Sequence, residues 1–454
     1  MQLLRPWANS SWTPEKPPPP LRLSAYERLP LALYIGLTLS ALFLPALQYT
    51  MVMGAALLAL YLFGAPTSHV GLNTLLWPVG IIVLLGTLGI FAEDHQTNFI
   101  IRDYWLYVRL AMILTLGFNF GARLRPVIFL RWTVRMAIAV SGYHIYQVIA
   151  SGSSFTGSAR AFRSQVGRGH TLPVVALAVV FTCYRYSRLR DLRLRSHEII
   201  IAVWLSVASV VLSFSRVRIA ALLLITVAPL LVATLQARPV FRRRISVLRV
   251  FALLALVLGA GGYALFSTNV GSDFSDKVGR SFSELTSDEF ADRAEINERW
   301  RSWERQRAWD TYEGAPPLTF MYGFGFGQLI DSEVGFEFDG EILRFLPVIH
   351  DGFTLTYVKV GVFGLAALFW VHYVLWRAGR VVARRLDDFE SVIGSIGMWS
   401  VVALILITPA VNGVLNYLMD PLTIFAAASV AMAYRSGQTV VVDPKIGQTV
   451  AARR

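Results

Sequence analysis

Arginines in three short stretches are the first candidates for chemistry, because lysine is rare in the same stretches. A guanidinium group donates two hydrogen bonds in one plane, which suits a phosphate better than the single charge of lysine does. We therefore expect a phosphate or pyrophosphate ligand, although lipid headgroups or nearby carboxylates are alternative partners. The three groups are Arg160, Arg163 and Arg168; Arg216 and Arg218; and Arg293, Arg299, Arg301, Arg305 and Arg307.

A second candidate is His350, which follows the glycine triplet Gly323, Gly325 and Gly327 and precedes Asp351. A neutral imidazole can take a proton from a hydroxyl group. Glycines at alternate positions allow the backbone to approach another backbone or a ligand closely. A single histidine at a helix end is more often structural, but the position of His350 after the glycine triplet and beside the arginine groups favours a chemical role.

The elements that must position these residues are membrane helices. Of the 454 residues, 55% are hydrophobic and 16% are charged, whereas a soluble domain has about 25% charged residues. Apolar runs of about 18–25 residues match the thickness of a bilayer. The sequence predicts an all-α polytopic membrane protein with about twelve spans, at 29–48, 49–65, 71–92, 104–121, 126–149, 170–186, 198–214, 217–235, 249–267, 351–376, 391–411 and 413–434.

The basic loops indicate the orientation. With a cytoplasmic N-terminus, the arginine-rich segments fall inside, as the positive-inside rule requires, at 123–131, 185–195, 238–249 and 377–385 and in the tail from 435. The three arginine groups then fall outside. The net charge of +13 is explained by topology, and no nucleic-acid partner is expected. The single cysteine, Cys183, excludes a disulfide framework and a cysteine metal site, and no cofactor is expected.

These runs divide the chain into five parts: a disordered cytoplasmic N-terminus at 1–28, nine spans at 29–267, an extracytoplasmic loop at 268–349, three spans at 350–434, and a cytoplasmic tail at 435–454. The long loop carries 16 of the 29 acidic residues, as suits an external segment. Its part from 287 to 312 lacks glycine and proline. We expect that part to form a helix at the membrane surface.

The order of these motifs resembles the O-antigen ligase/O-antigen polymerase superfamily. The matching residues are Ser215-Arg216, Arg305 with Trp309, the glycine triplet, His350-Asp351, Gly361 with Gly364, and the stretch around His170. The family usually has asparagine where this chain has Asp351, which leaves two roles open: raising the basicity of His350 or capping a helix. Arg299, Arg301 and Arg307 compete with Arg305 for the family position, and Arg305 fits the spacing best.

The resemblance implies a GT-C-like, metal-independent, inverting glycosyltransferase of the bacterial inner membrane. Its donor is an oligosaccharide on undecaprenyl pyrophosphate, and its acceptor is a carrier-linked glycan for a polymerase or lipid A core for a ligase. We favour a polymerase of a surface polysaccharide. Further expected partners are membrane lipids, a flippase and a chain-length regulator.

As a hypothesis, His350, Arg216 and Arg305 are the catalytic residues. Arg163, Arg168 and Arg218 assist Arg216 and Arg305 with the pyrophosphate, while the glycine triplet and Asp351 lie near the site.

Two other classes remain open. A transporter or flippase of lipid-linked glycans predicts charges at mid-membrane and a repeat between two halves; Arg109 and Arg135 are such charges, but no repeat is evident. A glycosyltransferase that uses polyprenyl-phosphate sugars needs an external acidic pair, for which Glu93-Asp94-His95 is a candidate. The same three residues are also typical of a solvated helix end.

Overall fold

The computed structural model describes the chain at residues 23–64, 70–91, 95–152, 162, 170–185, 188–227, 229, 268–279, 290, 293–338, 341–385 and 388–435. Several expectations lie outside these residues. They are the tail after residue 435, residues 1–22 of the expected disordered N-terminus, the end of the expected span at 217–235, the basic segment at 238–249, the whole expected span at 249–267, and Arg160, Arg163, Arg168, Glu93 and Asp94.

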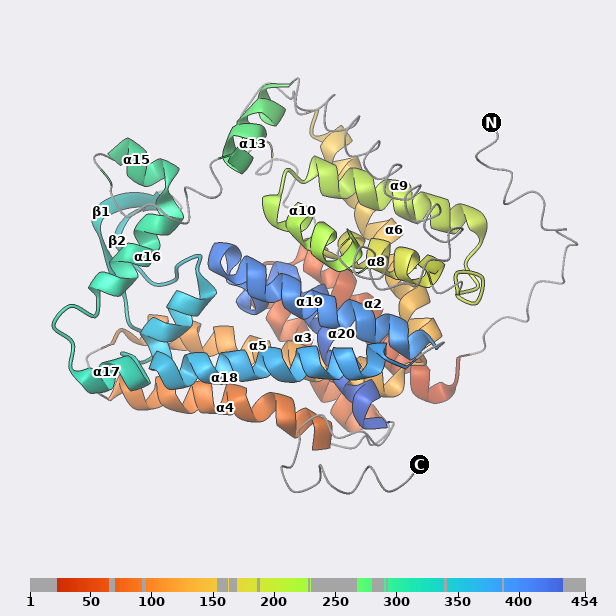
Figure 1. Cartoon of the computed structure of the whole chain (residues 1–454), viewed down its shortest axis with the longest axis horizontal. Helices are drawn as coiled ribbons and strands as arrows, with labels where there is room; N and C mark the ends of the chain where they lie inside the picture. Colours follow the sequence, from red (N-terminus) through yellow and green to blue (C-terminus); the bar gives the residue numbers. More distant parts are fainter. Residues whose placement is uncertain are drawn as a thin grey trace, which may run out of the picture.

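Most described residues belong to helices, many of which run along the long axis of the molecule (Figure 1). Six helices in the described part are long and apolar enough to cross a membrane, so the prediction of an all-α polytopic membrane protein is confirmed. Their neighbours α8 and α9 are apolar but shorter. The N-terminal series is α2 (Ala25–Phe43), α3 (Ala46–Phe63), α4 (Val70–Ile90), α5 (Thr97–Arg123), α6 (Pro126–Ala150), α8 (Leu172–Arg185), α9 (Ser196–Leu212) and α10 (Arg216–Leu222).

Prolines set two of these boundaries. The first two expected spans are separate helices, because the chain is extended at Leu44 and at Pro45, which occupies the N-cap position of α3. Pro126 is the first residue of α6, where the missing N–H would have no intrahelical partner. α6 therefore starts immediately after the basic turn at the end of α5.

The centre of the bundle is formed by α5 and the three C-terminal helices α18 (Gly352–Ala383), α19 (Phe389–Val411) and α20 (Asp420–Arg435). α20 is the most enclosed, with nearly all of its residues buried. Gly117 and Gly121 of α5 face it so closely that an added Cβ would lie less than 3.0 Å from the α20 backbone. Small residues four positions apart allow membrane helices to pack at this distance.

The last expected span differs from the structure at its start. The sequence predicts a helix from 413, but α20 begins at Asp420, after two short 3-10 turns at Gly413–Leu415 and Tyr417–Met419. The cause is local. Asn412 is left-handed (φ 61°), and the side chain of Asn416 accepts a hydrogen bond from the Leu418 N–H. Such asparagines compete with regular helix.

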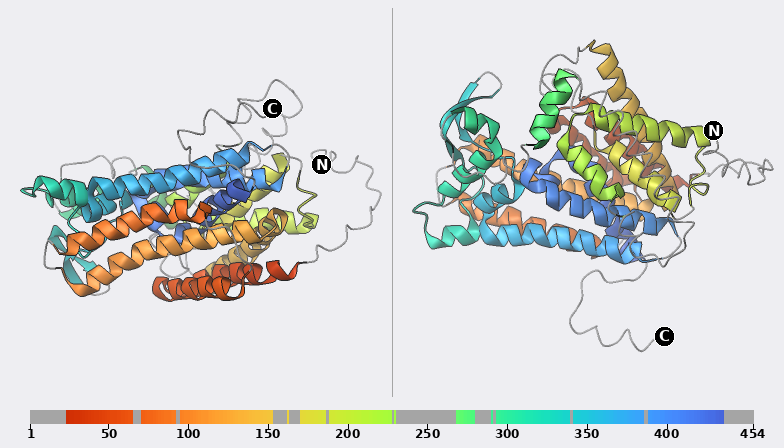
Figure 2. Two further views of the ribbon diagram at one scale, coloured as in Figure 1. Left: turned by 90° about the horizontal axis from the view of Figure 1, so that it is seen from below. Right: turned by 45° about the horizontal axis from the view of Figure 1, so that its top comes forward.

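The long loop folds at one end of the bundle (Figure 2) into α13 (Asn269–Gly279), α15 (Arg293–Glu298), α16 (Trp300–Asp310), α17 (Pro317–Tyr322) and the antiparallel strands β1 (Ile330–Phe338) and β2 (Glu341–Leu346). The expected helix at 287–312 is interrupted at Arg299 (φ −113°, ψ 33°). The hairpin was not predicted, because the register shift between Asp331 and Phe336 disturbs the alternation that marks a strand.

Candidate active site

His350 lies immediately before α18 and is held by a carboxylate from the loop. Its ring Nδ1 is 2.8 Å from Oε2 of Glu304, and its backbone N–H donates to the same oxygen at 2.9 Å. The Glu304 side chain is 3% exposed, whereas that of His350 is 49% exposed. An ionised carboxylate only accepts hydrogen bonds, so Nδ1 is the donor. The imidazole therefore keeps Nε2 as its acceptor, on an accessible ring.

α16 determines the position of Glu304. Trp300 lies one turn earlier on the same helix face, and its Nε1–H donates to Glu304 Oε1 at 2.6 Å. Both carboxylate oxygens are therefore fixed, one by the indole and one by His350. Sequence analysis missed Glu304, because a glutamate in an acid-rich loop carries no pattern that distinguishes it from its neighbours.

Arg305, the next residue of α16, contacts the residue after His350. Its Nε donates to Oδ2 of Asp351 at 3.0 Å. Asp351 also caps α18, since its carboxylate accepts hydrogen bonds from the Phe353 and Thr354 N–H groups and from the Thr354 hydroxyl. Of the two roles left open for Asp351, the structure therefore shows helix capping. The carboxylate that binds the ring of His350 belongs to Glu304 instead. Two adjacent residues of α16 thus hold two adjacent residues at the start of α18.

The end of α19 completes the support of His350. The Asn412 N–H donates to the His350 carbonyl at 2.7 Å. The start of α18 is thereby joined to the end of α19. His350 is held by Asn412 at its carbonyl and by Glu304 at its backbone N–H and its ring.

Within the glycine triplet, Gly323 and Gly325 pack against backbone, and Gly327 packs against side chains. Gly323, Gly325 and Gly327 have φ angles of 76°, 95° and 96°, and an added Cβ on each would lie less than 3.0 Å from atoms of α18, α4 or His95. Helix α18 is interrupted at Gly361 (φ 62°), which frees carbonyls that would otherwise bond within the helix. The Phe324 and Gly325 N–H groups donate to the carbonyls of Val358 and Lys359, each at 2.9 Å.

A buried ion pair fastens the same segment. Lys359 Nζ is 2.7 Å from Asp103 Oδ2, and the two side chains are 1% and 2% exposed. The same oxygen accepts the Gly327 N–H at 2.8 Å, and Lys359 also donates to the Gln328 carbonyl. Sequence analysis missed this pair, although a lysine inside an apolar span was an available signal.

Three further loop arginines bind groups of the loop itself. Arg307 pairs with Asp310 at 2.7 Å and with Glu333 at 2.8 Å, and Arg293 donates to the Gly335 carbonyl. The guanidinium of Arg344 holds the pKa of Asp331 below its usual value by hydrogen bonding. Among the arginines that compete for the family position, Arg305 contacts Asp351 at the start of α18.

Arg216 and Arg218 lie on a different element. Arg216 is the first residue of α10, after Ser215, and Arg218 is buried at 2% exposure. α10 packs beside α19 (Figures 1 and 2), whose last turn leads to Asn412 and the His350 carbonyl. His170, at the start of α8, is also buried. Arg163 and Arg168 lie outside the described residues, so their position relative to His350 stays a prediction.

Two other candidates from the sequence, His95 and Arg109, make structural contacts. His95, from the alternative acidic site, lies with its Nε2 3.0 Å from the Phe324 carbonyl, and so it joins α5 to the glycine triplet. Arg109, the mid-membrane charge, pairs with Asp420 at 2.7 Å. In the described part of the chain no group of three or more histidine, cysteine or acidic residues is placed to hold a metal.

Comparison with known families agrees with the motif order. Residues 201–369 match the model of the family described as O-antigen ligase. The chain carries an O-antigen ligase-family domain. This domain extends from α9 into α18 and includes Arg216, Glu304, Arg305, the glycine triplet and His350, so the resemblance drawn from the sequence is confirmed. No curated protein matches the chain significantly.

Proposed function

We propose that the protein polymerises a surface polysaccharide at the outer face of the bacterial inner membrane. In this proposal it transfers a glycan from undecaprenyl pyrophosphate to a sugar hydroxyl of an acceptor. The observation that carries the proposal is His350, whose half-exposed ring is bound at Nδ1 by the buried carboxylate of Glu304, while Arg305 donates to the next residue, Asp351.

The chemistry follows from that arrangement. Nε2 takes the proton of the acceptor hydroxyl, and the oxygen attacks the anomeric carbon of the donor as the bond from that carbon to the pyrophosphate oxygen breaks. The carboxylate of Glu304 stabilises the imidazolium that forms. Attack opposite the leaving group inverts the anomeric carbon. No metal or cofactor is needed in this scheme, because the leaving group is already activated.

The leaving pyrophosphate gains negative charge, which arginines stabilise best when they are fixed beforehand. Arg305 is fixed by Asp351, and Arg216 is placed by α10 next to α19. We propose that Arg305 and Arg216 bind the pyrophosphate, assisted by Arg218, Arg163 and Arg168. In this scheme Glu304 and Asp351 position the groups that react.

The family description favours a second candidate, an O-antigen ligase that transfers the glycan to lipid A core. The two candidates share the same base and the same leaving group and differ in the acceptor. Incubation of the purified chain with carrier-linked repeat units, followed by gel analysis, separates them. We expect a ladder of products; a single transfer that needs lipid A core would establish the ligase instead. Absence of both products would contradict the proposed reaction.

A further inference from the structure

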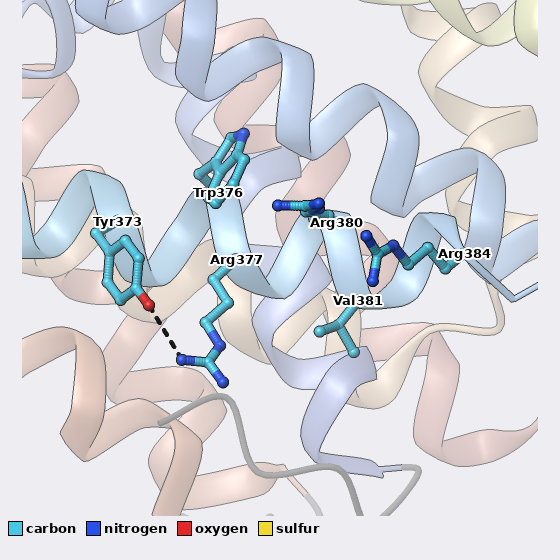
Figure 3. A pocket seen from close by; sticks show the side chains of 6 residues that line it. All are labelled: Tyr373, Trp376, Arg377, Arg380, Val381 and Arg384. Atoms are coloured by element: carbon cyan, nitrogen blue, oxygen red, sulfur yellow. Dashed lines mark hydrogen bonds between the residues drawn. The ribbon is translucent and has the colours of Figure 1, made fainter. Parts of the chain in front are cut away.

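Three arginines occupy one face of α18 near its C-terminal end. Arg377, Arg380 and Arg384 are spaced by three and four residues, so their side chains lie along the same face. Together with Tyr373, Trp376 and Val381 they line a hollow of about 330 Å³ (Figure 3). This cationic hollow lies at the opposite end of α18 from His350 and is separate from the candidate active site.

The charge of the cationic hollow is not neutralised by acidic groups in the described part of the chain. There, no carboxylate lies within 4.0 Å of Arg377, Arg380 or Arg384, whereas the adjacent Arg385 pairs with Glu390 at 3.0 Å. The contacts that hold these arginines are uncharged. Arg377 donates to the Tyr373 hydroxyl at 3.0 Å, and the Arg380 guanidinium lies 5.1 Å from the centre of the Trp376 ring. The three guanidinium groups therefore keep their positive charges on one face of α18, where a ligand can bind them.

The arginines of the cationic hollow indicate that it lies at the level of lipid headgroups. The part of α18 after its interruption at Gly361 runs to Ala383; it is about 33 Å long, and the hydrocarbon core is about 30 Å thick. Because charged side chains are costly inside that core, the end of the helix that carries the three arginines lies at the headgroups. About two turns before Arg377, the aromatic side chains of Phe369 and Trp370 are 44% and 45% exposed. The surface changes from cationic to apolar along α18, as an amphiphilic ligand requires.

We infer that the cationic hollow binds the phosphodiester headgroup of an anionic membrane phospholipid. The arginine forks bind the phosphate oxygens, and the acyl chains lie along Phe369 and Trp370. Basic pockets of this kind at the cytoplasmic ends of membrane helices are suited to anionic headgroups. A zwitterionic phospholipid has the same phosphate but adds an ammonium group, which the three arginines repel.

Native mass spectrometry of the full chain, titrated with phosphatidylglycerol or phosphatidylcholine, tests the inference. The test variant is Arg377→Gln, Arg380→Gln and Arg384→Gln combined. The matched control is Arg185→Gln, Arg190→Gln and Arg195→Gln combined, which removes the same charge from exposed side chains elsewhere. Each arginine near a headgroup contributes about 1 kcal/mol. We therefore expect at least about tenfold weaker phosphatidylglycerol binding in the test variant, and wild-type binding in the control.

Equal binding of phosphatidylglycerol by the wild type and the test variant would overturn the inference. Equal loss in the control would also overturn it, since net charge alone would then explain the binding. A third contrary result is displacement of the lipid by millimolar inorganic phosphate, which would indicate a site for a free anion. If the triple variant does not fold, Arg380→Gln alone, at an exposed side chain, carries the test with a loss of about fivefold.

Discussion

The carboxylate of Glu304 has two effects on His350. It fixes which ring nitrogen carries the proton, and it lies beside the positive charge that the ring gains when it acts as a base. Both effects depend on the negative charge of Glu304, because an amide of the same shape keeps a hydrogen bond but loses the charge. Where a carboxylate holds a metal-bound histidine in the same way, its loss changes activity by about 10–100-fold, and we expect an effect of similar size here.

Glu304→Gln should therefore lower the turnover number about 10–100-fold with little change in KM, and His350→Ala should lower it about 10²–10⁴-fold. The measurement is the rate of polymer formation from carrier-linked repeat units. Glu313→Gln, at an exposed glutamate of the same loop, is the control and should behave as wild type. An unchanged turnover number in Glu304→Gln would show that Glu304 does not position His350 for the reaction.

Arg305→Lys tests whether the planar fork matters in addition to the charge. Lysine keeps the positive charge but cannot donate two parallel hydrogen bonds, so we expect turnover to fall about 10²–10³-fold. Arg344→Lys, at an arginine that pairs with Asp331 on the surface, is the control. Thermal stability is measured on both, since a large loss of stability in Arg305→Lys would indicate that its bond to Asp351 is mainly structural.

At the scale of the elements, the glycine triplet connects the long loop to the helix bundle by close packing. Gly325→Ala places a Cβ less than 3.0 Å from the Gly89 backbone, at a φ of 95°. Gly314→Ala is its control, because Gly314 has a similar φ of 75° but nothing within 4 Å. Both variants lose about 1–2 kcal/mol through the left-handed backbone. We expect Gly325→Ala to lose about 1–3 kcal/mol more, seen as a lower Tm than that of Gly314→Ala.

The pair of Lys359 and Asp103 makes a second connection between elements. Lys359→Met leaves the Asp103 charge buried without its partner, which costs about 3–5 kcal/mol. We expect a clear drop in the free energy of unfolding, measured by denaturant titration in detergent. Combining it with Asp103→Asn should recover part of that loss, since no charge is then left buried. A double variant as unstable as Lys359→Met alone would contradict the ion-pair explanation.

For the whole molecule, the expected orientation places the long loop outside and the basic loops inside. The single native cysteine, Cys183, is buried, so an introduced cysteine can be labelled selectively. A membrane-impermeant maleimide should label Glu313→Cys in intact cells, and Arg190→Cys only after the inner membrane is permeabilised. The reverse pattern would invert the topology and move the proposed chemistry to the cytoplasmic side.

Much of the architecture could be predicted from the sequence, because apolar runs and loop charges are direct signals of membrane helices. The glycine triplet could also be predicted to pack closely, although its partners on α4 and α18 could not. Glu304 could not be found, because its role depends on a tertiary contact between α16 and the start of α18. The ion pair of Lys359 was missed even though a charged residue inside an apolar span was visible in the sequence.

The hydrogen bond from Trp300 to Glu304 has a spectroscopic consequence. It couples an indole directly to the carboxylate that holds His350, so a change in charge at that pair alters the electric field on the indole ring. The emission of Trp300 should therefore report on occupancy of the site without any added dye. Its contribution can be isolated from the other eleven of the 12 tryptophans by subtracting the spectrum of Trp300→Phe.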